Sequence, residues 1–454
     1  MYPQEAAKSP TYARRLGPFS ATMAVIGGII GAGIFLNPAI VAERVKTPFL
    51  TLAAWVVGGL IALAGALCFG ELGSRAPRAG GGYVYLRDAY GGLPAFLYGW
   101  ALLLVIATGA IAAVAVTFAR YTVALLALPQ AATLPTAVAA ITVLSTVNYV
   151  GVKPGAVTQN VFTLLKLAAL ALLIGAGLFL SVGPGTAVPA VAGPQAPPNL
   201  VLAMGAALVP VLFAIGGWQQ SNFIAEEIIE PERNLPLALV TGVTVVVVIY
   251  LLANVTYLRV LGAPGLAASA APAADVMRAV RGSGGATVIA AGIAISTFGF
   301  LNLVILVSPR VYQAMAADGA FFPALARLHP RFRTPAAAIV FQGLWGILLT
   351  LSGTYGQLLD YVVFGDWIFF GLVVSTLFVY RRREGPPGRG AATLGGTYRA
   401  WGYPWTPLLF VLAAAYVVAS SVASNPRNAA IGASLLALGV PVYLFWRARS
   451  ARTG

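Results

Sequence analysis

Four glycines interrupt an apolar stretch near the start of the chain, where they could expose backbone groups that bind a charged ligand. They are Gly27, Gly28, Gly31 and Gly33. Glycine costs roughly 1 kcal/mol relative to alanine inside a helix, so this concentration needs a physical reason. One interpretation is close packing of membrane helices, because small residues let two backbones approach. The other is a broken membrane-spanning helix, with freed N–H groups at residues 31–33 facing an anion and freed carbonyls near Ile29 facing a cation.

A second interruption lies near the middle of the chain, where Gly216 and Gly217 divide another apolar run. Polar residues follow it, namely Gln219, Gln220, Ser221 and Asn222. Glycine breaks at matching places in two halves are typical of inverted-repeat transporters with a ligand site near the bilayer midplane. Chance explains the pair poorly, although Gly makes up 51 of the 454 residues. Together the stretches favour the broken-helix interpretation, and an amino acid carries both of the charges that the first break would bind.

The composition is that of a membrane protein. Hydrophobic residues make up 59% of the chain and charged residues only 9%, whereas about 25% of the residues in a soluble domain are charged. The net charge is +15, but the basic residues lie at the ends of apolar runs, so membrane topology explains them better than nucleic-acid binding. One Cys and one His cannot form a Cys/His metal cluster, and the chain carries no P-loop motif.

Runs of about 20 apolar residues can cross a bilayer, and we predict twelve spans. They cover residues 18–42, 50–73, 94–126, 133–150, 157–182, 201–225, 236–260, 284–315, 335–352, 357–380, 404–423 and 428–447. An even number places both termini on one side, and most Lys and Arg residues lie in segments that are cytoplasmic if the N-terminus is inside. We therefore expect a multi-pass protein of the cell inner (plasma) membrane with both termini in the cytoplasm.

Several motifs resemble those of a known family. They are IGGIIGAGIFLNP (26–38), FGELGSRAPRAGGGYVYLRDAYGGLPAFLYGW (69–100), NVFTLLKLAAL (160–170), FAIGGWQQSNFIAEEIIEPERNLPLAL (213–239), FGFLNLVILVSPRVYQAMAADGAFFP (298–323) and GYPWTP (402–407). The chain resembles the amino acid–polyamine–organocation superfamily and, within it, the L-type amino acid transporters and their bacterial relatives. The resemblance implies an all-α membrane protein with the LeuT-type fold: two inverted repeats of five spans, broken helices 1 and 6, and two extra helices. The corresponding domains are residues 1–182, 183–380 and 381–454.

The resemblance also implies a substrate site at the two breaks. The backbone N–H groups of residues 31–33 would hold the substrate carboxylate. The carbonyls of Ile29, Phe213 and Gly216 would hold its α-amino group, and Phe213 would take part in closing the outer gate. The implied substrate-binding residues are Ile29, Gly31, Ala32, Gly33, Phe213, Ala214, Gly216, Gln219 and Asn302.

Two departures from the family pattern leave the preferred substrate side chain open. Ala32 stands where many members have Ser, so one hydroxyl contact is absent. Gln219 and Gln220 stand where Asn and an aromatic residue are common. Because backbone groups bind the part that all amino acids share, the wall of the pocket has to select the side chain.

Two charged residues lie well inside predicted spans, where a charge costs several kcal/mol unless it faces protein or water. Lys166 could snorkel to the cytoplasmic surface. The resemblance implies instead that its ammonium replaces the sodium of sodium-coupled relatives as a structural charge, so that transport is sodium-independent. Asp366 stands where relatives usually have an uncharged residue, and it is a candidate proton or cation site. The alternatives are pairing with Arg120 or facing the outer water.

Charges at the ends of spans have structural interpretations. Glu71 and Arg75 have the i, i+4 spacing of an ion pair on a helix. An acidic run follows the sixth span and is expected to be a solvated helix end and a partner for the nearby basic loops. Its members are Glu226, Glu227, Glu230 and Glu232.

The sequence thus predicts a transporter and not an enzyme: sodium-independent movement of neutral L-amino acids by alternating access, as an exchanger or a facilitator. A proton-coupled or cationic amino acid or polyamine transporter is an alternative, favoured if Asp366 faces the pocket. An amino acid sensor with this fold and a channel are further alternatives. The expected partners are the amino acid substrate and the lipid bilayer, with no nucleic acid, metal or cofactor. Animal L-type exchangers form a disulfide with a single-span glycoprotein, but Cys68 lies within a span, so we expect no disulfide-linked accessory subunit.

Overall fold

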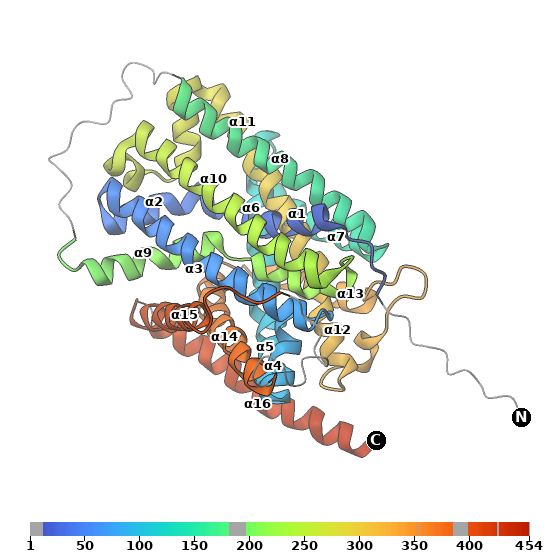
Figure 1. The fold of residues 1–454 in the computed structure, drawn as a ribbon. Coiled ribbons are helices and arrows are strands. Elements are labelled where there is room, and N and C mark those ends of the chain that lie inside the picture. Colours follow the sequence, from blue (N-terminus) through green and yellow to red (C-terminus); the bar gives the residue numbers. More distant parts are fainter. Residues whose placement is uncertain (1–11, 181–196, 354, 385–397, 425, 454) are drawn as a thin grey trace, which may run out of the picture.

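The structure is a computed structural model that describes residues 12–180, 197–353, 355–384, 398–424 and 426–453. These residues form long helices joined by connections (Figure 1). The α-helices are α1 (Pro18–Ile29), α2 (Gly33–Val45), α3 (Pro48–Arg75), α4 (Gly82–Tyr90), α5 (Gly92–Ala101), α6 (Ala107–Leu125), α7 (Thr133–Tyr149), α8 (Val152–Phe179), α9 (Leu200–Ile215), α10 (Pro231–Ala268), α11 (Pro272–Val307), α12 (Pro309–Ala317), α13 (Ala336–Ser352), α14 (Tyr355–Glu384), α15 (Trp405–Ser424) and α16 (Pro426–Thr453). The short elements are the π-helix η1 (Leu102–Ile106) and the 3₁₀ helices η2 (Gln130–Ala132), η3 (Trp218–Glu227) and η4 (Pro323–Ala326).

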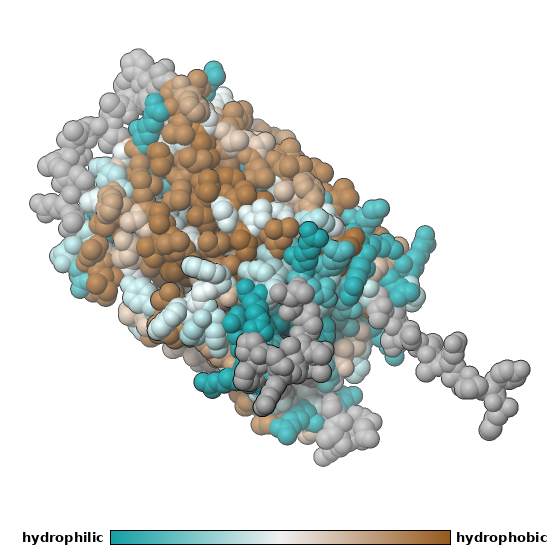
Figure 2. Space-filling model, in the orientation of Figure 1, coloured by the Kyte–Doolittle hydropathy of each residue, from teal (hydrophilic) through white to brown (hydrophobic). Residues whose placement is uncertain are grey.

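The helices are those of a multi-pass membrane protein. Among the described residues, nine helical segments are long and apolar enough to cross a membrane, and ten are if the bent pair α1–α2 counts as one span. Figure 2 shows a broad apolar surface over the middle of the molecule, with hydrophilic side chains gathered toward the end where α12 and the end of α16 lie. α13 is apolar but shorter, and the side chains of residues 355–364 in α14 are not described, so the count of twelve spans stays a prediction.

Both glycine stretches interrupt their helices where the sequence predicts a break. α1 ends at Ile29, Ile30 is extended (φ −76°, ψ 95°), and α2 begins at Gly33 after a bend of 42°. α9 ends at Ile215, and Gly217 adopts φ +98°, a left-handed conformation that favours glycine. The chain then continues as the 3₁₀ helix η3, so the second half of this broken span is more tightly wound than an α-helix.

The two broken spans run antiparallel and touch at their breaks. α1 packs against η3, and α2 packs against α9. Where the first span begins and the second ends, the backbone N–H of Ile229 donates to the carbonyl of Leu16 at 2.9 Å. At the crossing, a Cβ built on Gly217 would lie 2.1 Å from the carbonyl oxygen of Gly28. The glycines therefore allow the two backbones to cross in close contact and also allow the helices to break.

The helices around the breaks form two packed sets. The bundle helices are α1, α2, α3, α9 and α10, in which α10 packs against α1, α2 and α3 (Figure 1). The scaffold helices are α6, α7, α11 and α13, in which α6 packs against the other three. α8 contacts α11 on one side and α1 and α10 on the other, so it joins the two sets.

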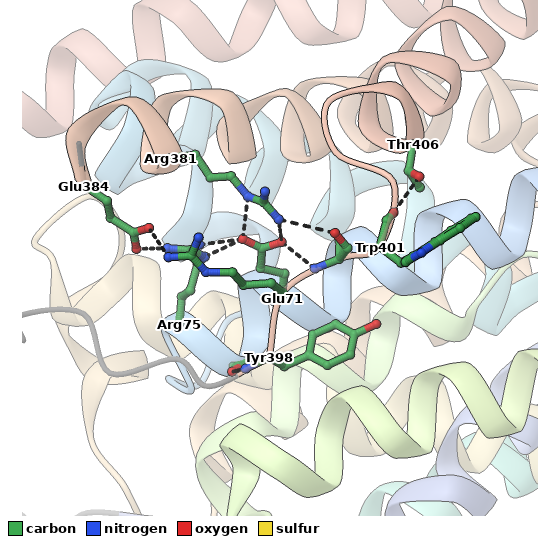
Figure 3. Close-up of polar contacts among 10 residues, drawn as sticks. Glu71, Arg75, Arg381, Glu384, Tyr398, Trp401 and Thr406 are labelled. Atoms are coloured by element: carbon green, nitrogen blue, oxygen red, sulfur yellow. Dashed lines mark hydrogen bonds and ion pairs between the residues drawn. The ribbon is translucent and has the colours of Figure 1, made fainter. Parts of the chain in front are cut away.

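A buried carboxylate ties the ends of α3 and α14 together (Figure 3). Glu71 of α3 forms ion pairs with Arg75 and with Arg381 of α14, each at 2.5 Å. The backbone N–H of Ala400, in the segment before α15, donates to the same carboxylate at 2.7 Å. Glu384 pairs with Arg75 from the other side. The predicted Glu71–Arg75 pair is thus present, as part of a larger Glu71 cluster.

Replacing Gly217 with alanine should destabilise the fold by about 1–3 kcal/mol, because the new Cβ imposes strain on a left-handed backbone that already touches Gly28. The measurement is thermal unfolding of the purified protein in detergent. Gly175→Ala is the matched control, since a Cβ there would meet no other atom within 4 Å. Equal melting temperatures for the two variants would contradict the crossing described here.

Replacing Glu71 with glutamine should cost about 3–5 kcal/mol, because it leaves the buried Arg75 and the partly buried Arg381 without their shared carboxylate. Thermal unfolding in detergent measures the effect, and Glu43→Gln at an exposed position of α2 is the control. If both glutamine variants unfold at the wild-type temperature, the Glu71 cluster does not hold α3 to α14.

Candidate functional site

A cavity of about 260 Å³ lies where the two breaks face α6, α11 and α14. This volume is slightly below that of typical small-molecule pockets, which measure roughly 300–1,000 Å³, and suits one small ligand. All the predicted substrate-binding residues except Asn302 line it, namely Ile29, Gly31, Ala32, Gly33, Phe213, Ala214, Gly216 and Gln219. The structure therefore brings together two stretches that are far apart in the sequence.

The first break presents backbone donors to this cavity. Within the described part of the chain, the N–H groups of Gly31 and Ala32 have no acceptor, and α2 begins at Gly33 without a side-chain cap. The first N–H groups of a helix carry the positive end of its dipole. This arrangement can hold an anionic group such as a carboxylate.

Lys166 reaches the carbonyls of the first break from α8. Its side chain is fully buried, and Nζ donates to the carbonyl of Ile30 at 2.6 Å and to that of Gly27 at 3.1 Å. A Cβ built on Gly299 of α11 would lie 3.4 Å from the same Nζ. The ammonium therefore lies between α1, α8 and α11, and the side chain does not snorkel to the surface.

Side chains from α10 and α11 occupy other carbonyls of the first break. The hydroxyl of Tyr250 donates to the carbonyl of Ile29 at 3.2 Å, and the hydroxyl of Ser296 donates to that of Gly31 at 3.1 Å. A carbonyl oxygen has two lone pairs, so Ile29 retains one acceptor position for a ligand ammonium. The protein itself thus satisfies most of the acceptors of this break and leaves its donors facing the cavity.

The second break supplies an aromatic ring and two amides. Phe213 is 41% exposed although it lies within a span, because it lines the cavity. Gln219 turns back on the break, where its Oε1 accepts the N–H of Gly217 at 3.0 Å. Gln220 also lines the cavity, and its buried Oε1 has no hydrogen-bond partner among the described residues. Gln220 therefore offers a ligand an acceptor oxygen that no described group of the protein uses.

Asp366 of α14 lines the cavity and is half-buried. It is the only charged residue among the described residues of the lining. Arg120, its predicted alternative partner, lines a different cavity beside Leu128 and Thr350. Asp366 thus faces the cavity, as a role in binding a proton or a cation requires.

Comparison with known proteins identifies the family of the chain. The family model described as "Amino acid permease" matches residues 16–445. The chain belongs to the amino acid permease family. It is 34% identical to the human b(0,+)-type amino acid transporter 1 over 378 residues, which cover 82% of this chain and 77% of that protein. It is 31% identical to the mouse large neutral amino acids transporter small subunit 2 over 449 residues, or 96% of this chain and 82% of that protein.

The family assignment gives the chain its general role. Both relatives are amino acid transporters by name, and the matched residues span the breaks and every helix that lines the cavity. The protein is therefore an amino acid transporter of the amino acid–polyamine–organocation superfamily, related to the L-type transporters, and not an enzyme.

Asn302 of this permease lies outside the cavity lining. Its Nδ2 donates to Gln159 Oε1 at 3.1 Å and to the carbonyl of Gly155 at 3.2 Å, both on α8. Its Oδ1 accepts from Asn148 of α7 at 3.0 Å, and the side chain is fully buried. Asn302 thus joins α7, α8 and α11 and does not form part of the cavity wall.

The acidic run after the second break is not simply a solvated helix end, which corrects the sequence interpretation. Glu230 is exposed, but the side chain of Glu227 is 0% exposed and pairs at 2.8 Å with Arg310, whose side chain is 0% exposed too. This pair joins η3 to α12. The partners are 83 residues apart, so no local pattern could have revealed it.

Sequence reasoning missed several residues of the cavity wall. They include Asn37, Tyr98, Phe223, Phe300 and Trp367. Asn37 lies about one helical turn beyond Gly33, so helical geometry could have found it. Tyr98 and Trp367 come from distant spans, and only the tertiary structure brings them to the breaks.

Replacing Lys166 with methionine should reduce amino acid uptake by roughly 10- to 100-fold, because two carbonyls of the first break lose a charged donor. The measurement is uptake of a labelled amino acid into proteoliposomes that contain equal amounts of folded protein. Lys153→Met, at an exposed position near the start of α8, is the control. Unchanged uptake by the Lys166 variant would show that its ammonium is not needed at the break.

Proposed function

We propose that the protein is a sodium-independent transporter of neutral L-amino acids, which it moves by alternating access as an exchanger or facilitator. The observation that carries the proposal is the shared cavity of the two breaks, in which free backbone donors at Gly31 and Ala32 lie beside an acceptor at Ile29. These groups match the carboxylate and the ammonium of any amino acid. The wall around them is largely apolar, which supports neutral substrates.

Sodium independence is supported by the position of Lys166. Its ammonium already binds the carbonyls of Ile30 and Gly27, which are oxygen ligands of the kind that a sodium ion would need. A second cation at these carbonyls would be repelled at close range inside the low dielectric of the protein. The lysine thus supplies as a fixed charge what a bound ion would otherwise supply.

Alternating access is supported by the division of the helices into bundle helices and scaffold helices, each of which packs extensively within its own set. The proposed motion swings the two breaks, which touch each other, as one body against α6, α7, α11 and α13. The buried Glu227–Arg310 pair crosses between η3 and α12, so it would have to separate when that end opens. The proposed architecture is the LeuT-type arrangement of twelve spans, with the repeats in 1–182 and 183–380 and two further spans in 381–454.

The proposed setting is the cell inner membrane, with both termini in the cytoplasm and no disulfide-linked accessory subunit. Cys68 supports the last point, because it is buried within α3 and cannot reach a partner in an outside loop.

Counterflow in proteoliposomes tests the transport mode. We expect liposomes loaded with unlabelled leucine or alanine to take up labelled leucine at least about tenfold faster than empty ones if the protein is an exchanger. Replacing sodium with choline, or collapsing the proton gradient, should leave the rate unchanged, and liposomes without protein are the control. Uptake that requires sodium would contradict the role given to Lys166, and uptake without saturation would indicate a channel.

A further inference from the structure

Asp366 stands apart from the rest of the cavity wall because it carries the only charge among the described lining residues. Within the described part of the chain, no Lys or Arg side chain pairs with it and no hydrogen bond reaches its carboxylate. An unpaired carboxylate in a membrane interior costs several kcal/mol and is retained where it serves a pathway or a ligand. The cost would be offset by a cation that enters the cavity.

The surroundings of Asp366 suit an organic cation. Tyr98, Trp367 and Phe370 line the same cavity, and aromatic faces attract ammonium and guanidinium groups. α14 packs against η1 and α6, whereas the first break packs against α10, α8 and η3. The carboxylate and the backbone donors of the break therefore belong to different walls of one cavity.

Apolar side chains of η1 and α6 also line the cavity that contains both groups. They include Ile106, Ala110 and Val114. A ligand that spans the cavity would need a polar group at one end, an apolar stem and a cationic group at the other. Lysine and arginine have this form, because their long methylene stems pack on apolar surface while the charged group reaches a polar partner.

We propose that Asp366 is a specificity-determining residue that binds the cationic side chain of a basic amino acid, whose α-amino and α-carboxyl groups lie at the breaks. This inference rests on the proposed function, and it extends the substrates from neutral to basic amino acids. Neutral substrates leave Asp366 without a partner, so its charge discriminates in favour of the basic ones.

Direct binding to the purified full-length protein in detergent tests the role of Asp366, with labelled leucine and labelled arginine as the two probes. We expect the wild type to bind both. Asp366→Asn should weaken arginine binding by about tenfold or more and change leucine binding by less than about twofold, because a charge-assisted hydrogen bond is lost only for arginine. Asp366→Glu keeps the charge. It should therefore bind arginine clearly more tightly than Asp366→Asn does.

Asp275→Asn is the matched control, since Asp275 lies outside the cavity and pairs with Arg278 on α11. It should leave the affinities of both ligands unchanged. Equal arginine affinity in the wild type and Asp366→Asn would overturn the inference. A wild type that binds leucine but not arginine would also overturn the inference. In that case, uptake that follows a proton gradient only when Asp366 is present would indicate that Asp366 binds a proton.

The outcomes for the transport mode are separate. Arginine binding that depends on Asp366, without counterflow of any amino acid, would support the specificity role and refute the proposed exchange. Counterflow of leucine, with no effect of Asp366→Asn on arginine binding, would support the proposed exchange and refute the specificity role of Asp366. Failure of the wild type to bind either ligand would refute both.

Discussion

The constraint on which the rest of the structure depends is that a membrane offers no water to satisfy a broken helix. Each break frees backbone donors and acceptors, and the protein treats the two kinds differently. At the first break, Lys166, Tyr250 and Ser296 take up the carbonyls, whereas the N–H groups of Gly31 and Ala32 have no partner in the described part of the chain. The group that this site lacks most is therefore an anion, and in the proposed function a substrate carboxylate would stabilise the break as it binds.

The same contacts tie the binding site to the parts that would move. Lys166 and Ser296 reach the first break from α8 and α11, and Gly28 and Gly217 hold the two breaks together. A motion of the bundle helices against the scaffold must therefore change the environment of the carbonyls that border the cavity. In the proposed function, ligand binding and the position of the bundle would be coupled through shared hydrogen bonds, without the need for a distant pathway.

The parts of the site that the sequence predicted are those whose signal is local. The glycine breaks can be recognised in the sequence because their backbone conformations restrict the residue type, as at Gly217. The burial of Lys166 follows from the apolar residues on either side of it. Asn302 was assigned to the cavity because it lies in a family motif, but its hydrogen bonds are to α7 and α8. The Glu227–Arg310 pair depends on how two distant helix ends meet, and no periodicity records that.

The division of the cavity between backbone and wall explains how one site can be both general and selective. In the proposed site the breaks would bind the part that every amino acid shares, so they would contribute affinity without choosing among side chains. An apolar wall discriminates weakly, because one methylene changes the binding energy by only about 1–3 kcal/mol. A buried charge discriminates strongly. The free energy of a paired and of an unpaired buried charge differs by more than one methylene contributes to binding. In the proposed site, the wall position of Asp366, away from the breaks, would therefore let the preference for side-chain charge vary without disturbing the groups that recognise the amino acid itself.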